Sequence, residues 1–184
     1  NPLAEPYILG ISSGATAGAS LFYLGFLPPL VSKALSMPVA AFGGGLATIT
    51  VVYLVARNGP RISVARLLLA GVAMSALMAA ITSFVTLSSP DPDKLRAVLF
   101  WLLGSLSGAR WEVLLLPACA VGIGTGLLLL AARPLDALLM GEEAARSLGM
   151  PVEALKRSLI VLAAFVTGSL VAVSGAVGFV GLII

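Results

Sequence analysis

The sequence has no histidine, one cysteine and few charged residues. Charged residues make up 10% of its 184 residues, whereas a typical soluble domain has roughly 25%. Without histidine or paired thiols, the chain lacks the common zinc ligands and the common base that activates a nucleophile. The single thiol, Cys119, cannot form an internal disulfide, and we expect it to pack inside an apolar stretch as a small hydrophobic residue. These absences predict a protein that is not an enzyme, with no catalytic residues and no metal site.

Hydrophobic residues are abundant instead, at 59% of the chain, and the mean hydropathy is +1.09. A bilayer core about 30 Å thick requires about 20 apolar residues in a helix, and backbone polar groups in lipid must be paired within that helix. The sequence therefore predicts an all-α fold, a polytopic transmembrane helix bundle in which residues 1–184 form one domain. The stretches of sufficient length are Pro6–Leu30, Pro38–Ala56, Leu67–Ser88, Val113–Ala132 and Ser158–Ser174.

Small residues mark the expected contacts between these helices. Gly10, Gly14 and Gly18 follow one another at four-residue spacing, which places them on one helical face. Such a face allows a second helix to approach closely. After the last stretch, Gly175, Gly178 and Gly181 stand at three-residue spacing and predict a break or tight packing rather than one straight helix.

Between the third and fourth stretches, Leu95–Gly108 is apolar but too short to cross a bilayer. Asp91 or Asp93 can cap the start of a helix here, and the neighbouring prolines prevent the preceding helix from continuing. Two interpretations are open: a re-entrant helix that borders a pathway, or an amphipathic connector on the membrane surface.

Basic residues are distributed unequally between the loops. If successive loops alternate sides, seven cations fall on one side and four on the other. The positive-inside rule assigns the richer side to the cytoplasm. The eleven basic residues are scattered between the apolar stretches and form no basic stripe, so we expect membrane lipid rather than nucleic acid as the chain's surroundings. The predicted cytoplasmic cations are Arg57, Arg61, Arg66, Arg133, Arg146, Lys156 and Arg157, and the predicted outer cations are Lys33, Lys94, Arg96 and Arg110.

The predicted cytoplasmic loop 133–157 contains a polar helix with its own start and stop residues. Glu142 and Glu143 lie in its first turn, where the helix dipole favours acids, and Arg146 can pair with Glu142 one turn later. Gly149 ends the helix, and Pro151 prevents it from resuming. A tether between two spans needs no such specification, so we predict that the loop docks a soluble partner; the alternative is a surface helix without a partner. The apolar docking residues are Leu139, Met140 and Leu148.

The predicted spans contain no Asp, Glu, Lys or Arg deep inside them. Ion-coupled transporters and proton relays place ionisable groups at such depth, because those groups bind and release the coupling ion. A transporter without them takes its energy from elsewhere. We therefore favour a driven transporter over the alternative, an ATP-independent channel or secondary carrier.

Five sequence blocks stand out in order: Asn1–Ala15 (NPLAEPYILGISSGA), Leu67–Ala73 (LLLAGVA), Phe100–Gly108 (FWLLGSLSG), Gly141–Gly149 (GEEAARSLG) and Gly175–Ile183 (GAVGFVGLI). They resemble the successive signature blocks of the FecCD/BtuC family. Members of that family are the permease subunits of type II ABC importers for iron-siderophores, haem and cobalamin. The blocks occur in the family order and together extend over nearly the whole chain.

This resemblance implies that the chain is the central piece of a ten-helix subunit, family helices three to seven, with both ends cut. It implies a multi-pass permease of the prokaryotic cell membrane that forms a pathway with a second permease copy, in a homodimer or heterodimer. Two cytoplasmic ATPase subunits would drive transport, so ATP and Mg would bind to those partners and no cofactor to this chain. A periplasmic or lipid-anchored binding protein would deliver the cargo.

The resemblance also implies roles for particular residues. The polar loop matches the coupling helices, which dock in a groove of the ATPase, and a cytoplasmic gate lies just before the third stretch. That stretch matches the pathway-lining helix, and Leu95–Gly108 matches the outer helix that borders the cavity. The implied coupling residues are Leu139, Met140, Glu142, Glu143, Arg146, Leu148 and Gly149; the gate residues are Ser63, Val64 and Ala65; the pathway-lining residues are Met74, Ser75, Met78, Thr82 and Ser83.

Overall fold

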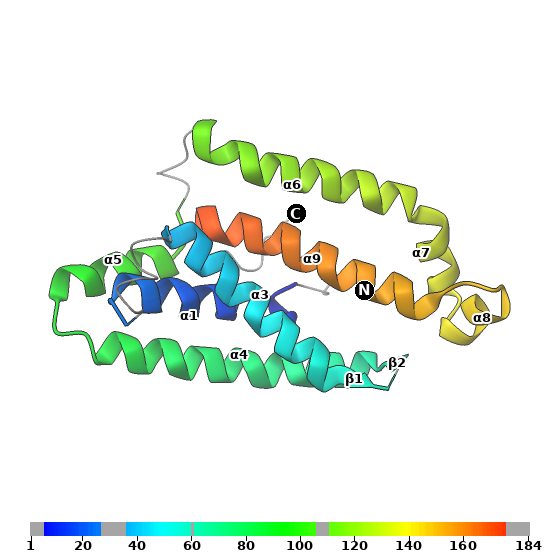
Figure 1. The fold of residues 1–184 in the computed structure, drawn as a ribbon, viewed down its shortest axis with the longest axis horizontal. Coiled ribbons are helices and arrows are strands. Elements are labelled where there is room, and N and C mark those ends of the chain that lie inside the picture. Colours follow the sequence, from blue (N-terminus) through cyan, green and yellow to red (C-terminus); the bar gives the residue numbers. More distant parts are fainter. Residues whose placement is uncertain (1–5, 27–35, 60, 106–110, 176–184) are drawn as a thin grey trace.

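The computed structural model describes residues 6–26, 36–59, 61–105 and 111–175, and these form a helix bundle (Figure 1). The predicted all-α transmembrane fold is confirmed. Two short strands form an antiparallel hairpin that pairs Arg57 with Ile62 and joins two long helices. In chain order the elements are η1 (Pro6–Leu9), α1 (Ile11–Tyr23), α3 (Met37–Ala56), β1 (Arg57–Asn58), β2 (Arg61–Ile62), α4 (Val64–Leu87), α5 (Pro92–Leu102), α6 (Trp111–Leu130), α7 (Ala132–Leu139), α8 (Glu142–Ser147) and α9 (Val152–Ser174).

Four helices of the described chain are long and apolar enough to cross a membrane. They are α3, α4, α9 and residues 113–130 of α6, and they correspond to four of the five predicted stretches. The last helix begins at Val152 rather than at Ser158. Its first two turns carry Glu153, Lys156 and Arg157, so the helix continues past the point where its apolar composition ends.

The first predicted stretch, Pro6–Leu30, differs from expectation. It contains a 3₁₀ turn followed by α1, which is 13 residues long and therefore shorter than the roughly 20 residues a span requires. Gly10 separates the two with φ 77°, in the left-handed region that favours glycine. A second glycine in that region, Gly25 with φ 75°, follows the end of α1. Residues 27–30 lie outside the described residues.

Helix α1 lies inside the bundle, packed against α3, α4 and α9. Its crossing with α3 is close, because a Cβ atom on Gly14 would lie 2.6 Å from the Gly44 carbonyl oxygen. A Cβ atom on Gly18 would likewise clash with the Ala40 carbonyl. Of the three glycines predicted to share one helical face, Gly14 and Gly18 do so, and only glycine permits this separation of the two backbones. The prediction is wrong for Gly10, which precedes α1.

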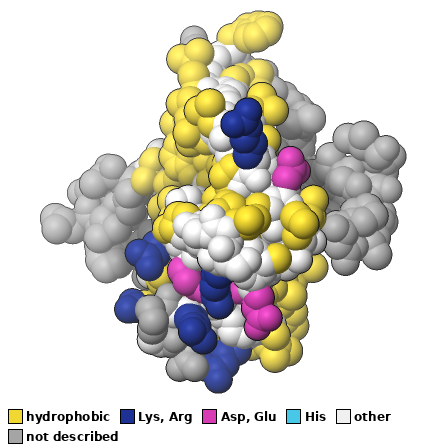
Figure 2. Space-filling model, turned by 90° about the vertical axis from the view of Figure 1, so that its right-hand side faces the viewer, with side chains coloured by type: hydrophobic (Ala, Val, Ile, Leu, Met, Phe, Trp, Pro, Cys, Tyr) yellow, Lys and Arg dark blue, Asp and Glu magenta, His cyan; other side chains and the backbone are white. Residues whose placement is uncertain are grey.

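The two ends of the bundle differ in charge. The hairpin, α7 and α8 lie at one end, and α5 lies at the other (Figure 1). Residues 57–66 and 132–157 are called the polar end here, and Figure 2 shows acidic and basic side chains gathered on it. All seven cations assigned to one side of the membrane belong to the polar end, whereas Lys94 and Arg96 belong to α5. Lys33 and Arg110 lie outside the described residues.

The opposite end is closed by α5. Asp91 caps this helix, accepting hydrogen bonds from the backbone N–H groups of Asp93 at 3.0 Å and Lys94 at 3.3 Å. After the helix, the Ser105 N–H donates to the Ser174 carbonyl at 2.8 Å. Helix α9 ends there at Gly175, whose φ is 78°. The predicted break at Gly175 is confirmed, while Gly178, Gly181 and residues 106–108 lie outside the described part of the chain.

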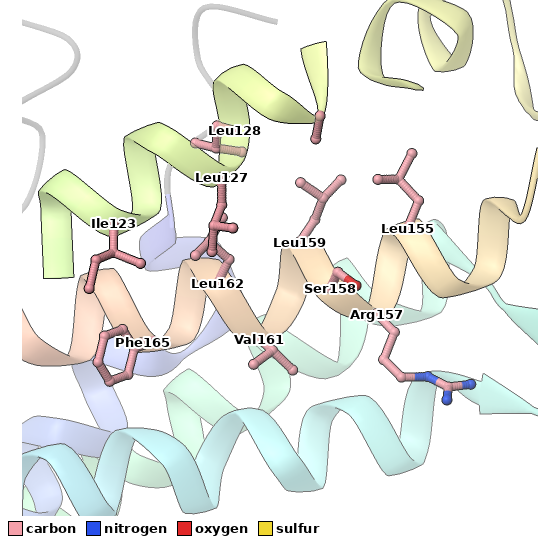
Figure 3. A pocket seen from close by; sticks show the side chains of 11 residues that line it. Ile123, Leu127, Leu128, Leu155, Arg157, Ser158, Leu159, Val161, Leu162 and Phe165 are labelled. Carbon is pink, nitrogen blue, oxygen red and sulfur yellow. The ribbon is translucent and has the colours of Figure 1, made fainter. Parts of the chain in front are cut away.

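Large apolar surfaces remain exposed in the described bundle. Helix α6 packs mainly against α9, and only 17% of residues 113–130 is buried. Between α6 and α9 runs an apolar groove of about 670 Å³, lined by side chains such as Ile123, Leu127 and Leu162 (Figure 3). Contrary to expectation, Cys119 on α6 is exposed. Surfaces of this kind require lipid or further helices against them.

Candidate coupling site at the polar end

Helix α8 is short and is bounded by two glycines with positive φ. Gly141 precedes it with φ 104°, and Gly149 follows it with φ 81°. The Gly149 N–H donates to the Arg146 carbonyl at 2.9 Å, and the Met150 N–H donates to the Ala145 carbonyl at 3.1 Å. This paired pattern is the Schellman motif that ends helices at a left-handed residue. The predicted start and stop of the polar helix are therefore confirmed.

Three apolar side chains project from this loop into solvent. Leu139 ends α7 and is 87% exposed, Met140 in the following turn is 74% exposed, and Leu148 after α8 is 68% exposed. Isolated exposed leucines are ordinary. Two exposed leucines and an exposed methionine on one polar loop, together called the apolar patch below, are suited to contact with a protein partner. The structure thus places the predicted docking residues Leu139, Met140 and Leu148 on the exposed surface of the polar end.

Glu142 and Arg146 instead form ion pairs within the molecule. Arg146 Nη2 lies 2.6 Å from Glu153 Oε1 and 3.4 Å from Glu142 Oε2. Lys156 Nζ lies 2.7 Å from Glu142 Oε1 and 3.6 Å from Glu153 Oε1. Glu142, Arg146, Glu153 and Lys156, called the charge cluster below, therefore join α8 to the first two turns of α9.

The charge cluster also binds the backbone of the hairpin. The Ile62 N–H donates to Glu153 Oε2 at 2.8 Å, and Lys156 Nζ donates to the Ile62 carbonyl at 2.9 Å. The Lys156 side chain is only 10% exposed, and Ile62 is buried. Because these groups are largely buried, solvent and salt screen the contacts less than they screen ion pairs on an open surface.

The predicted gate residues follow Ile62 directly. Ser63 caps α4, since its Oγ accepts a hydrogen bond from the Arg66 N–H at 3.4 Å. Val64 and Ala65 form the first turn of α4, and both are exposed. The charge cluster therefore holds the residue next to the predicted gate, although the gating role itself stays a prediction.

The predicted pathway residues lie on two different faces of α4. Met74 and Met78 line a groove shared with α1 and α3. Ser75 is half-buried, and Thr82 is buried, with its hydroxyl donating to the Met78 carbonyl at 2.9 Å. Ser83 is exposed. The first four thus lie towards the helices described here, and only Ser83 faces away; their place in a pathway stays a prediction.

Sequence reasoning did not identify Glu153 and Lys156 as site residues. The one feature of the sequence that could have indicated them is that they are opposite charges three residues apart, at the start of an apolar helix. From the sequence, Lys156 was identified only as one of the cations that indicate membrane topology. Its contact is a backbone carbonyl 94 residues away, and no side-chain pattern reveals such a partner.

The described residues contain no group of three or more His, Cys, Asp or Glu side chains that could hold a metal ion. The Asp, Glu, Lys and Arg side chains of the described spans lie near helix starts, at Arg66 in α4 and at Glu153, Lys156 and Arg157 in α9. The polar end therefore offers two features to a partner or a transport cycle, the exposed apolar patch and the charge cluster beside the predicted gate.

Comparison with known proteins agrees with this architecture. The chain is 40% identical to the cobalamin import system permease protein BtuC of Halobacterium salinarum, over all of this chain and 48% of that protein. It is 42% identical to the hemin transport system permease protein HmuU of Yersinia pestis, over all of this chain and 55% of that protein. The chain thus spans about half the length of these curated relatives.

A solved structure has the same arrangement of helices. It is described as an inward-facing conformation of a metal-chelate type ABC transporter, and it matches with a TM-score of 0.87 and 30% sequence identity. The match covers all of this chain and 56% of the solved one. The family model for the FecCD transport family matches residues 1–184. The chain, with its membrane-spanning helices and its polar loop, belongs to the FecCD transport family.

Proposed function

We propose that this chain is the central part of a permease subunit in an ATP-driven importer. The exposed apolar patch on the capped polar loop carries this proposal, because a connector between two spans needs no such surface. Relatives along the whole chain are permease proteins of import systems, which supports the same function. The permease itself performs no chemistry, and ATP and Mg bind to the partner subunits.

The proposed cargo is a bulky iron chelate, haem or a cobalamin-like compound. The names of the relatives support this class, since they include cobalamin, hemin and Fe(3+)-citrate systems. Beyond Arg66 in the first turn, the exposed face of α4, with Ser83 and small residues such as Ala76 and Ala80, is uncharged. Such a wall suits movement of a large compound without tight binding to it. We assign this face to the pathway, opposite a second permease copy.

We further propose that the polar end is cytoplasmic and receives the ATPase. Leu139, Met140 and Leu148 enter a groove of that subunit, with Glu143 and Gly149 beside them. The main role of Glu142 and Arg146 is to hold α8 in position through their ion pairs, not to contact the ATPase. The end that contains α5 faces a periplasmic or lipid-anchored binding protein, which delivers the cargo.

The test uses the full-length permease expressed together with its ATPase. Changing Leu139, Met140 and Leu148 together to serine removes the apolar patch and leaves the charge cluster intact. We expect the ATPase no longer to co-purify, while the permease level in the membrane is unchanged. Leu103→Ser is the matched control, because Leu103 is 78% exposed but follows α5 at the other end. Retention of the ATPase by the triple variant would contradict the proposal.

The alternative function, an ATP-independent channel or secondary carrier, makes a different prediction. Uptake would then persist without the ATPase and follow an ion gradient. The described spans place their Asp, Glu, Lys and Arg side chains near helix starts rather than at mid-membrane depth, which disfavours ion coupling. Uptake measured after ATP depletion, with the ion gradient maintained, separates the two functions.

A further inference from the structure

We propose that Glu153 and Lys156 are positioning residues that hold Ile62, and with it the predicted gate, to the coupling helix α8. The inference rests on the function proposed above and assigns the route by which motion of α8 reaches α4. Each of the two side chains has one contact to the hairpin and further contacts within the charge cluster.

Glu153 and Lys156 bind both polar backbone groups of Ile62, its N–H and its carbonyl. Glu153 accepts from the Ile62 N–H, and Lys156 donates to the Ile62 carbonyl. The two side chains stand three residues apart on one helix and therefore share a face of it. Because donor and acceptor are both held from α9, Ile62 cannot rotate or slide without breaking a buried hydrogen bond.

The contact to α8 uses the same two side chains. Glu153 Oε1 pairs with Arg146, and Lys156 Nζ pairs with Glu142. Helix α8 has six residues, of which only Ala145 is buried, and a helix this short is not stable through its own backbone. The orientation of α8 therefore depends on the charge cluster, and a displaced α8 moves or breaks contacts that also hold Ile62.

No short stretch of chain provides this connection. Ile62 and Glu142 are separated along the sequence by α4, α5, α6 and α7. Lys156 Nζ contacts both residues directly, at 2.7 Å from Glu142 Oε1 and 2.9 Å from the Ile62 carbonyl oxygen. Glu153 provides a second link, through Arg146. Ser63, the first predicted gate residue, follows Ile62 and caps α4. The cluster is thus a direct mechanical link between the proposed docking loop and the start of the proposed pathway helix.

The test measures cargo uptake per ATP hydrolysed by the full-length permease with its ATPase in proteoliposomes. Glu153→Gln keeps an acceptor for Ile62 but loses the ion pairs, and Lys156→Met loses both contacts. We expect both variants to retain the ATPase and hydrolyse ATP, while uptake per ATP falls about tenfold, within the 5–150-fold range of typical coupling between sites. Lys156→Arg keeps the charge and a donor, and we expect it to restore most of the coupling.

Two matched controls lie at the same end of the molecule outside the charge cluster. Arg157→Gln changes a neighbouring exposed cation on α9, and Asp136→Asn changes an exposed acid on α7. Both should keep uptake per ATP at the parent value. Parent coupling in Glu153→Gln and Lys156→Met would overturn the inference, even if the ATPase still co-purifies. If the ATPase does not co-purify even with the unmutated permease, the proposed function itself would be overturned.

A distance measurement gives a readout that does not depend on uptake. Spin labels on cysteines replacing Arg61 in β2 and Ser147 in α8, in a Cys119→Ser background, report the hairpin-to-α8 distance; both positions are exposed. We expect one narrow distance distribution in the parent, with and without ATP, and a broad distribution after Lys156→Met, which removes the contacts to both Glu142 and Ile62. An equally narrow distribution in that variant would show that the cluster does not hold the two elements together.

Discussion

The carboxylate of Glu153 accepts a hydrogen bond from the Ile62 backbone N–H at 2.8 Å, although the two residues are 91 positions apart. The same carboxylate pairs with Arg146 of α8 at 2.6 Å. One side chain on the first turn of α9 therefore contacts both the hairpin before α4 and the polar loop. This relationship places the proposed docking loop and the predicted gate in one connected unit of the polar end.

Replacing Lys156 by methionine should destabilise the polar end. The side chain keeps most of its volume, but the Ile62 carbonyl loses its partner and Glu142 loses a cation. Breaking a buried ion pair costs about 3–5 kcal/mol; because the Glu142 side chain is 38% exposed, water replaces part of the loss and we expect about 2 kcal/mol. Thermal unfolding of the purified full-length permease measures this. Arg157→Met, at an exposed neighbour, should change stability by less than about 0.5 kcal/mol.

The α1–α3 crossing should not tolerate a side chain at Gly44. A Cβ atom there would clash with the Gly14 carbonyl oxygen, which is backbone and cannot move aside cheaply. We expect Gly44→Ala to cost about 1–3 kcal/mol through overpacking and to reduce the amount of folded permease in the membrane. Gly43→Ala is the control on the same helix, because nothing lies within 4 Å of its Cβ position. Equal loss in both variants would show that the close crossing is not the cause.

Gly149→Ala should weaken the end of α8 through backbone conformation alone. Gly149 has φ 81° and no atom within 4 Å of its Cβ position, so sterics with neighbours play no part. The left-handed conformation costs a non-glycine residue about 1–2 kcal/mol. Gly149→Asn should be milder, since asparagine tolerates this conformation better. Limited proteolysis of the polar loop checks the order glycine, asparagine, alanine; equal cleavage of all three would contradict it.

The orientation of the bundle can be tested by thiol labelling in a Cys119→Ser background. Arg61 belongs to the hairpin at the polar end, and Arg96 belongs to α5 at the other end; both are exposed. The excess of cations at the polar end predicts that it faces the cytoplasm. A membrane-impermeant maleimide should therefore label Arg96→Cys in intact cells and Arg61→Cys only after permeabilisation. Labelling in the reverse order would invert the proposed topology.

Much of the bundle was predictable because lipid imposes a length and a composition on each span. The bounds of α3 and the end of α4 follow from apolar runs of about 20 residues. The start of α4 does not, because the helix begins at Val64, before the predicted start at Leu67, and includes Arg66. The break at Gly10 was not predictable in the same way, since the apolar run continues through it and the glycine spacing equally suits a packed helix. The start of α9 was misplaced because hydropathy changes at Ser158, whereas the backbone remains helical from Val152.

The candidate site was predictable only in part, for a physical reason. Caps and neighbouring charges act over one helical turn, so the bounds of α8 and the Glu142–Arg146 pair were visible in the sequence. The contacts of Lys156 depend on how α9, α8 and the hairpin fold together. A backbone carbonyl such as that of Ile62 has no sequence-specific chemistry, so its role emerges only from the three-dimensional structure.

The central claim is that the polar loop is the point where the ATPase meets the membrane subunit. The most direct measurement places a photo-crosslinking amino acid at Leu148, in the full-length permease expressed with its ATPase. The same residue at Leu103, equally apolar and exposed at the other end, is the control. We expect a crosslink to the ATPase from position 148 and none from position 103. No crosslink from position 148 in an assembled, active transporter would contradict it.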